Sequence, residues 1–336
     1  MKNRVVPLTL STALVLSACG GGGGDSGSTA LPAAPVSTMS MVTTANANKV
    51  AGNAYVGSTA LSDSSSSLSG FLTGVSAGQP TIGVVRPALD LIRHVYPRTS
   101  GQLLTGVTMT EACSGGGSLT IDANLSNSQT ASNGDTITLT AKNCVEGGDT
   151  INGSLFIKMS NISGDVFNSS NWSATLDSTF TGFAVTSGAD MVSVNGDMKI
   201  ALTQTNSTTS SMTLSGKSLQ TSTQRSGVSV GTVTLADFSM TGSTRGTTVT
   251  NAASFAMSGS NSALGQFSYT VKNLQPFVST GGATPSSGSL IVNGAASSVT
   301  LTVVAPTGVR LDFSAKGDGV TTQTTNLSWT ELLASL

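Results

Sequence analysis

The dominant pattern in this chain is an alternation of apolar and polar residues that begins near Leu103 and continues to the end. The clearest example runs from Val192 to Leu202, where every second residue is apolar or glycine and most of the residues between are polar. A period of two places successive side chains on opposite faces of a strand. The pattern therefore predicts a half-buried strand of about eleven residues over 192–202.

The same alternation recurs in many further segments, which are separated by turn signals rather than by helical ones. The alternating segments include 119–123, 137–141, 155–159, 255–257, 267–271, 290–292, 299–303 and 309–313. The turn signals include Asn133-Gly134, Gly147-Gly148-Asp149, Thr244-Arg245-Gly246, Asn293-Gly294 and Asp318-Gly319. Asn195-Gly196 falls inside a strand pattern, so there we expect a kink or bulge. Together these segments predict roughly twelve to fourteen antiparallel strands in a meander with one apolar and one polar face.

A sheet this wide has to cover its apolar face, and three solutions exist: a barrel or half-barrel, a sandwich, or contact with lipid. Long meandering strands favour the first. A membrane-spanning barrel is a weaker alternative, because aromatic residues make up only 4% of the chain. The predicted fold class is mainly β: a large curved antiparallel meander sheet, half-barrel or barrel-like, with two N-terminal helices packed on its apolar face.

Helical spacing of apolar residues occurs only before this sheet. The first predicted helix follows Thr43 or Thr44 as N-cap, and its apolar positions are Ala47, Val50, Ala51, Ala54 and Leu61. In the second predicted helix, Pro87 suits a position in the first turn, and Pro97 ends the helix. Its apolar face is Val85, Ala88, Leu89, Ile92 and Val95. These helices are predicted to fill the concave side of the sheet.

The N-terminus has the order of a secretory signal: basic Lys2 and Arg4, an apolar run over 5–16, and a junction of small residues. The junction, Leu16-Ser17-Ala18-Cys19, resembles the lipobox of bacterial lipoproteins. This resemblance implies cleavage before Cys19 and attachment of a lipid, such as palmitate, to Cys19. Because Gly20 rather than Asp follows the cysteine, the resemblance also implies an outer-membrane, lipid-anchored location, on either its periplasmic or its surface side.

The rest of the chain divides by composition. Residues 1–18 form the predicted signal peptide, and 19–42 form the lipidated cysteine with a flexible Gly/Ser/Pro linker. Residues 43–100 form the helical segment and 101–336 the antiparallel β-sheet domain. The body resembles the Ser/Thr/Gly-rich bodies of uncharacterised proteobacterial outer-membrane lipoproteins, which share the oligoglycine. The half-barrel-with-helix architecture is similar to that of periplasmic lipoprotein carriers, at the level of fold alone.

Three cysteines are present. With Cys19 assigned to the lipid, Cys113 and Cys144 are the remaining pair. An exported chain meets an oxidising compartment, so we expect a disulfide between them rather than a redox-active dithiol, which normally has close spacing. The closed loop of about 31 residues predicts a stabilisation of roughly 3–4 kcal/mol.

Charge and motif content restrict the function. The chain has 15 basic and 16 acidic residues, a net of −1, and loss of Lys2 and Arg4 leaves 13 against 16, a net of −3. There is no basic stripe to favour nucleic acid. A single histidine excludes a Ser-His-Asp triad or a multi-histidine metal site, and a nucleophile-elbow motif is absent. We therefore predict a protein that is not an enzyme and needs no cofactor or metal, with a hydrolase as a minor alternative.

Several residues each fit both a functional and a structural interpretation. His94 fits a general base or a surface helix position, and the arginine cluster fits a lipid head group or a solvated helix face. The aspartates next to glycines resemble weak calcium loops but fit turns better, and the tryptophans fit sugar stacking or burial. In order, these residues are His94; Arg86, Arg93 and Arg98; Asp149 and Asp318; Trp172 and Trp329.

Two functions remain. The leading hypothesis is a non-enzymatic outer-membrane lipoprotein, a structural or binding module that accepts a lipid or another apolar small molecule on the concave sheet face. The second is a surface-exposed adhesin or envelope-spacer protein that acts through its polar Ser/Thr face.

Overall fold

The structure is a computed structural model that describes residues 38–58, 107–127, 130–166, 169–281, 284–306 and 308–336. The predicted signal peptide, Cys19 and the second predicted helix with His94 and the arginine cluster lie outside the described residues. The described chain is mainly β, as predicted.

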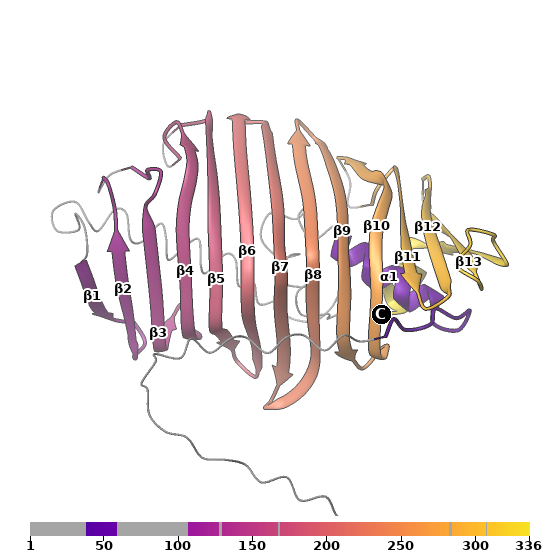
Figure 1. Ribbon diagram of the computed structural model, residues 1–336, viewed down its shortest axis with the longest axis horizontal. Helices are drawn as coiled ribbons and strands as arrows, with labels where there is room; N and C mark the ends of the chain where they lie inside the picture. Colours follow the sequence, from indigo (N-terminus) through magenta and orange to yellow (C-terminus); the bar gives the residue numbers. More distant parts are fainter. Residues whose placement is uncertain (1–37, 59–106, 128–129, 167–168, 282–283, 307) are drawn as a thin grey trace, which may run out of the picture. The chain divides into compact units, whose positions relative to one another are not determined.

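One antiparallel sheet of 14 strands contains every described strand, and the strand order in the sheet equals the order in the chain (Figure 1). The first seven strands are β1 (Val107–Ala112), β2 (Ser118–Asn124), β3 (Thr136–Glu146), β4 (Asp149–Ser163), β5 (Trp172–Ser187), β6 (Asp190–Asn206) and β7 (Thr209–Arg225). The last seven are β8 (Val228–Arg245), β9 (Thr248–Asn261), β10 (Gly265–Thr280), β11 (Ser287–Gly294), β12 (Ser297–Val304), β13 (Gly308–Ser314) and β14 (Gln323–Ser328). The predicted meander is confirmed.

The sheet is not closed. Within the described residues β1 pairs only with β2 and β14 only with β13. The closed, barrel-like form of the prediction is therefore not formed, because closure would need these two edge strands to pair. No helix among the described residues is both long and apolar enough to cross a membrane.

Burial follows the predicted alternation. On β6, the side chains of Val192, Val194, Met198 and Ile200 are buried, whereas Ser193 and Lys199 between them face the other side. The neighbouring strands present matching apolar residues at the same register, so one face of the sheet forms a continuous hydrophobic core. The opposite face carries mainly Ser, Thr and charged residues.

The helical prediction is confirmed for one element, and the second predicted helix lies outside the described residues. The helix α1 (Ala47–Ser58) buries Val50, Ala51 and Ala54 as predicted, and Thr43 accepts a hydrogen bond from the Asn46 amide through its side-chain oxygen, as an N-cap does. It contacts β9, β11, β12 and β13; a helix of this length, about 18 Å, is as long as four strand spacings, so it spans these strands by lying across them.

The other described helix lies at the C-terminus, not the N-terminus. The helix α4 (Trp329–Ala334) contacts α1, β13 and β14. It begins with a capping box in which Ser328 and Glu331 satisfy each other's backbone amides. The sequence signal for this helix was Ser-x-x-Glu before an apolar pair. The alternation of the preceding strand concealed this signal, because the alternation continues to Ser328.

A line of bulges crosses the sheet. We call it the bulge row; its left-handed residues are Asn143 on β3, Gly153 on β4, Gly182 on β5, Gly196 on β6 and Asp237 on β8. Asn and Asp side chains hold the bulges by accepting hydrogen bonds from backbone N–H groups of an adjacent strand. These bonds are Asn143 N to Asn152 Oδ1 (2.8 Å), Gly182 N to Asn195 Oδ1 (2.6 Å) and Lys217 N to Asp197 Oδ2 (3.0 Å).

The bulge row explains why the apolar period slips in mid-strand. Phe180 and Phe183 are both buried, and so are Leu235 and Phe238, although residues three apart point to opposite faces of a regular strand. The extra residue in each bulge restores the apolar side chain to the core face. The kink or bulge predicted at Asn195-Gly196 is confirmed, and it is one member of this row.

Candidate functional site

The polar face of the sheet is an ordered array of hydroxyl groups. Antiparallel pairing places Ser173, Thr203, Ser211, Ser243 and Thr250 directly beside one another across β5 to β9. We call these five residues the hydroxyl row. Neighbours in such a row are about 4.8 Å apart, and the next residue on the same face follows about 6.8 Å along each strand. Because each hydroxyl both donates and accepts, the row presents a regular hydrogen-bonding surface.

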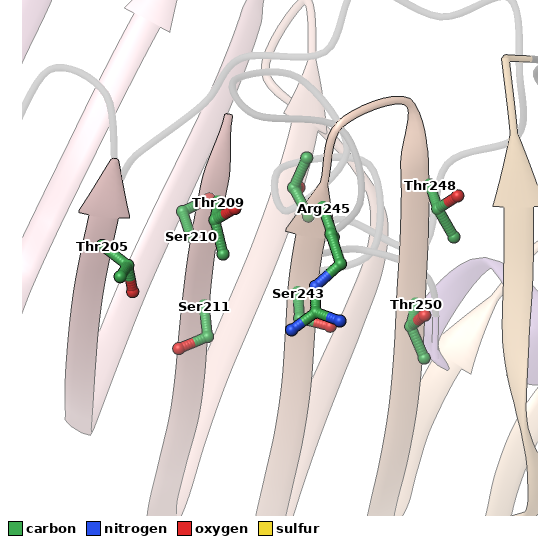
Figure 2. Close-up of a pocket in the computed structure, with 9 residues that line it drawn as sticks. Thr205, Thr209, Ser210, Ser211, Ser243, Arg245, Thr248 and Thr250 are labelled. Carbon is green, nitrogen blue, oxygen red and sulfur yellow. The ribbon is translucent and has the colours of Figure 1, made fainter. Parts of the chain in front are cut away.

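A cavity of about 420 Å³ lies on this face, where the β6–β7 and β8–β9 hairpins end. We call it the Arg245 pocket (Figure 2). It is lined by Thr205, Thr209, Ser210, Ser211, Ser243, Thr244, Arg245, Thr248 and Thr250. Two registered sets form its floor: Thr209, Arg245 and Thr248 in one line, and Ser211, Ser243 and Thr250 in the next. In Figure 2 the guanidinium of Arg245 lies over Ser243, between Ser211 and Thr250.

Arg245 differs from the other described arginines. The Arg225 Nε lies 2.8 Å from Asp190 Oδ1, and the Arg310 Nε lies 2.8 Å from Asp312 Oδ2. The hydrogen bond to Asp190 raises the pKa of Arg225 above its ordinary value. Arg245 forms no hydrogen bond or ion pair with any described residue, and no acid lines its pocket. Among the described residues, no carboxylate therefore compensates its charge.

Among the residues with a described position, one aromatic side chain on the polar face is exposed. Phe156 on β4 is 38% exposed and lies between Thr138 and Thr179 of the adjacent strands. The residues that flank it along β4, Leu155 and Ile157, are buried in the core. An aromatic ring at a solvent-facing position among hydroxyls serves no purpose in core packing, and it offers a flat apolar platform on an otherwise polar surface.

The chain matches no family model, no curated protein and no solved structure. What the protein does therefore has to follow from its own residues.

On the core side of the sheet, an aromatic cluster joins the helices to the strands. The ring of Tyr55 on α1 lies 5.1 Å from that of Phe277 and 4.6 Å from that of Trp329, measured between centroids. Asn251 stands opposite Phe277 in the β9–β10 register and is buried. The Asn251 Oδ1 and Trp329 Nε1 atoms are buried and have no hydrogen-bond partner in the part of the chain that the structure describes. Unpaired buried polar atoms are rare in folded proteins, so these two atoms mark an unusual place in the core.

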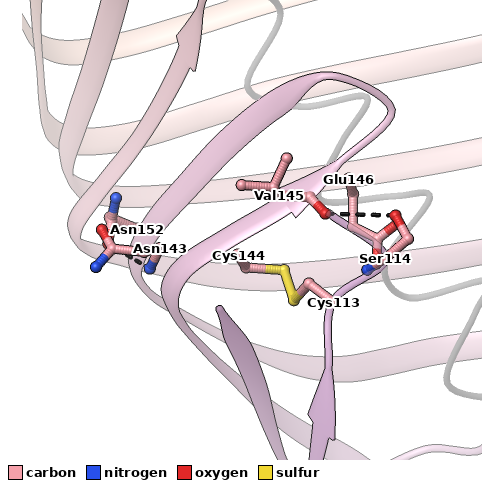
Figure 3. Close-up of a disulfide and its surroundings, with 7 residues drawn as sticks. All are labelled: Cys113, Ser114, Asn143, Cys144, Val145, Glu146 and Asn152. Atoms are coloured by element: carbon pink, nitrogen blue, oxygen red, sulfur yellow. Dashed lines mark hydrogen bonds between the residues drawn. A yellow bond between two sulfur atoms is a disulfide. The ribbon is translucent and has the colours of Figure 1, made fainter. Parts of the chain in front are cut away.

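The predicted disulfide is formed. Cys113 and Cys144 are joined, with their Cα atoms 5.3 Å apart, and link the turn after β1 to the end of β3 (Figure 3). Beside it, Ser114 donates its amide and its hydroxyl to the two carboxylate oxygens of Glu146, at 2.9 and 2.8 Å. The two sulfurs and the Glu146 carboxylate lie within 4.8 Å of one another. Since the sulfurs are oxidised, they offer no thiolate to a metal ion, and the cluster is a structural staple.

The other residues that the sequence analysis singled out lie in turns, in the core or outside the described residues. Asp149 opens β4 after the Gly147–Gly148 turn, and Asp318 accepts hydrogen bonds from Ser314 Oγ and Val320 N within a loop, so both have the predicted turn role. Trp329 is buried, whereas Trp172 at the start of β5 is half-buried. Cys19, His94, Arg86, Arg93 and Arg98 lie outside the described residues.

Sequence reasoning missed the Arg245 pocket. It placed Thr244-Arg245-Gly246 in a turn, and Arg245 is indeed the last residue of β8. The usable signal was the repetition of Ser and Thr at alternate positions at the ends of two successive hairpins, with one arginine among them. That signal becomes a site only when the register is known.

Proposed function

We propose that this protein is a non-enzymatic, lipid-anchored binding module of the outer membrane, which uses its polar face to hold a hydroxyl-rich partner such as a polysaccharide. Anchoring follows from the lipobox-like segment that ends at Cys19, and it stays a proposal together with the outer-membrane location. The partner corresponds to the adhesin or envelope-spacer hypothesis drawn from the Ser/Thr composition.

The observation that carries the proposal is the Arg245 pocket on the hydroxyl face. Side chains on the core face, such as Leu155, Ile157 and Phe183, are buried and present no open surface. The polar face instead combines registered hydroxyls, a cavity of a size that small ligands occupy, and the exposed ring of Phe156. Hydroxyl pairs and an aromatic platform are complementary to the polar edges and the flatter apolar face of a sugar ring.

Affinity electrophoresis tests this proposal. Full-length detergent-solubilised protein is run in native gels that contain dextran or dextran sulfate, and we expect its migration to be retarded. The variant Ser211→Ala/Ser243→Ala/Thr250→Val should be retarded less. The matched control is Ser222→Ala/Thr232→Val/Ser260→Ala, a registered row on the polar face at the other end of the same three strands, which should behave as the wild type. Wild-type migration that is unchanged by either polymer would refute the proposal.

The anchor has its own test. Cys19→Ser removes the only atom that the lipobox-like segment offers for lipid attachment. We expect this variant to be absent from the membrane fraction of the expressing cells, whereas the wild-type protein is found there. Protease treatment of intact cells then distinguishes the two sides of the membrane, because a periplasm-facing protein is protected and a surface-exposed one is cleaved.

A second candidate function is the binding of a lipid or other apolar molecule inside the sheet, favoured by the unpaired Asn251 Oδ1 and Trp329 Nε1 beside the aromatic cluster. Such a ligand would offer a donor to Asn251 Oδ1 or an acceptor to Trp329 Nε1 and would pack its apolar part against Tyr55 and Phe277. Mass spectrometry of gently purified protein tests it: a co-purifying lipid supports this function, and a protein free of small molecules argues against it. The part of the fold prediction that places a second helix, over 85–97, on the apolar face also stays a proposal.

A further inference from the structure

We infer that the Arg245 pocket binds a tetrahedral oxyanion, a sulfate or phosphate ester carried by a polysaccharide. This inference rests on the proposed function and names the chemical group that the polar face selects. Its starting point is the charge of Arg245, which no described carboxylate compensates, in a pocket whose other described lining residues are all Ser or Thr.

Arg245 supplies the charge and the geometry for such a group. A guanidinium carries a permanent positive charge and a planar fork of N–H donors that matches two oxygens of a sulfate or phosphate. Arg225 and Arg310 already use their donors on Asp190 and Asp312. Because Arg245 makes no such bond with any residue that the structure describes, its donors are available to a ligand.

The hydroxyls around Arg245 supply further donors. In Figure 2 Ser243 lies beside the guanidinium, and Ser211 and Thr250 lie on the two flanking strands; none of the three has a side-chain hydrogen bond to a described residue. Thr248 differs, since its hydroxyl lies 3.3 Å from that of Thr280. A tetrahedral anion has more oxygens than one arginine can satisfy, so hydroxyl donors on two adjacent strands complete its coordination. A neutral sugar would leave the guanidinium charge without a partner.

The size of the pocket and its surroundings favour an ester on a polymer over a free ion. A volume of about 420 Å³ is far more than a single tetrahedral anion fills. The hydroxyl row continues from the pocket through Thr203 to Ser173 on β6 and β5. A chain of sugar rings that is held at one anionic substituent would extend along these hydroxyls.

Binding of dextran sulfate, of uncharged dextran of the same length and of inorganic phosphate to the full-length protein tests the inference, measured by microscale thermophoresis at constant ionic strength. We expect the wild type to bind dextran sulfate at least about tenfold more tightly than dextran, because a charge-assisted hydrogen bond contributes about that factor. Arg245→Gln should lose this preference, and Arg245→Lys should keep part of it.

Arg225→Gln is the matched control, because it removes the same charge at the other end of β7, where the arginine is paired. It should bind dextran sulfate within about twofold of the wild type. Equal loss in both variants would indicate a general charge effect and overturn the inference. Equal binding of dextran and dextran sulfate that is unaffected by Arg245→Gln would also overturn it but leave the proposed function standing. Failure to bind either polymer would refute both, and phosphate binding as tight as that of dextran sulfate would overturn the polymer part.

Discussion

Gly153 and Gly182 allow the bulge row to be tested by two substitutions of the same kind. Gly153 has φ +92°, and a Cβ built on it would lie 2.1 Å from the Gly182 carbonyl oxygen and 2.7 Å from the Phe183 Cα. Both obstacles are backbone atoms of β5, so they cannot rotate away. Gly153→Ala must therefore separate β4 from β5 at the bulge. We expect it to lower the free energy of unfolding by about 3 kcal/mol, from about 1–2 for the left-handed backbone and about 1 for each hydrogen bond lost.

Gly182→Ala is the control. Gly182 has φ +55°, and nothing lies within 4 Å of its added Cβ. This variant carries only the cost of the left-handed backbone, about 1 kcal/mol, and it keeps the Gly182 N–H bond to Asn195. Urea unfolding, followed by tryptophan fluorescence and circular dichroism, measures the free energy of unfolding of both variants. If the free energies of unfolding of the two variants differ by less than about 0.5 kcal/mol, β4 and β5 do not approach each other this closely at the bulge.

Three further perturbations address other parts of the fold. Replacing Cys113 and Cys144 by Ser should lower the free energy of unfolding by about 3–4 kcal/mol. The wild type in the presence of a reductant should lose the same amount, and a loss below about 1 kcal/mol would contradict the structural role of the disulfide. The bonds from Ser328 lower the pKa of Glu331 below its ordinary 4.5, so the stabilisation they bring is complete above that value and is lost as pH falls through the lowered one. We expect the fluorescence of Trp329 to change as the pH falls in the wild type but not in Glu331→Gln. Parallel pH curves for the two proteins would contradict this expectation. Trp329→Ala should lower the free energy of unfolding by about 3–5 kcal/mol, while Leu274→Ala, at a 54% exposed site, should change it by less than about 0.5; calorimetry compares the two.

Pattern reasoning succeeded where one residue's environment depends on its neighbours in the chain. Alternation over 192–202 identified β6 and its buried face, and helical spacing identified α1, because both periods are set by local backbone geometry. The disulfide followed from the number of cysteines and the expected compartment. The helix α4 was missed, although Ser328 and Glu331 carried a local signal, because the strand pattern before it runs without a break into its N-cap.

The amino-acid sequence by itself determined that this protein forms strands with one apolar and one hydroxyl-coated face, since a period of two leaves no other arrangement of its side chains. Only the tertiary structure decided how those strands meet. Register aligns Ser211, Ser243 and Thr250 from three strands, and the bulge row shifts the faces of single strands by one residue. Whether β1 and β14 pair, and whether Arg245 meets an acid, depends on distances between residues far apart in the chain. Those distances arise from packing and hydrogen bonding across the whole sheet, which no local pattern encodes.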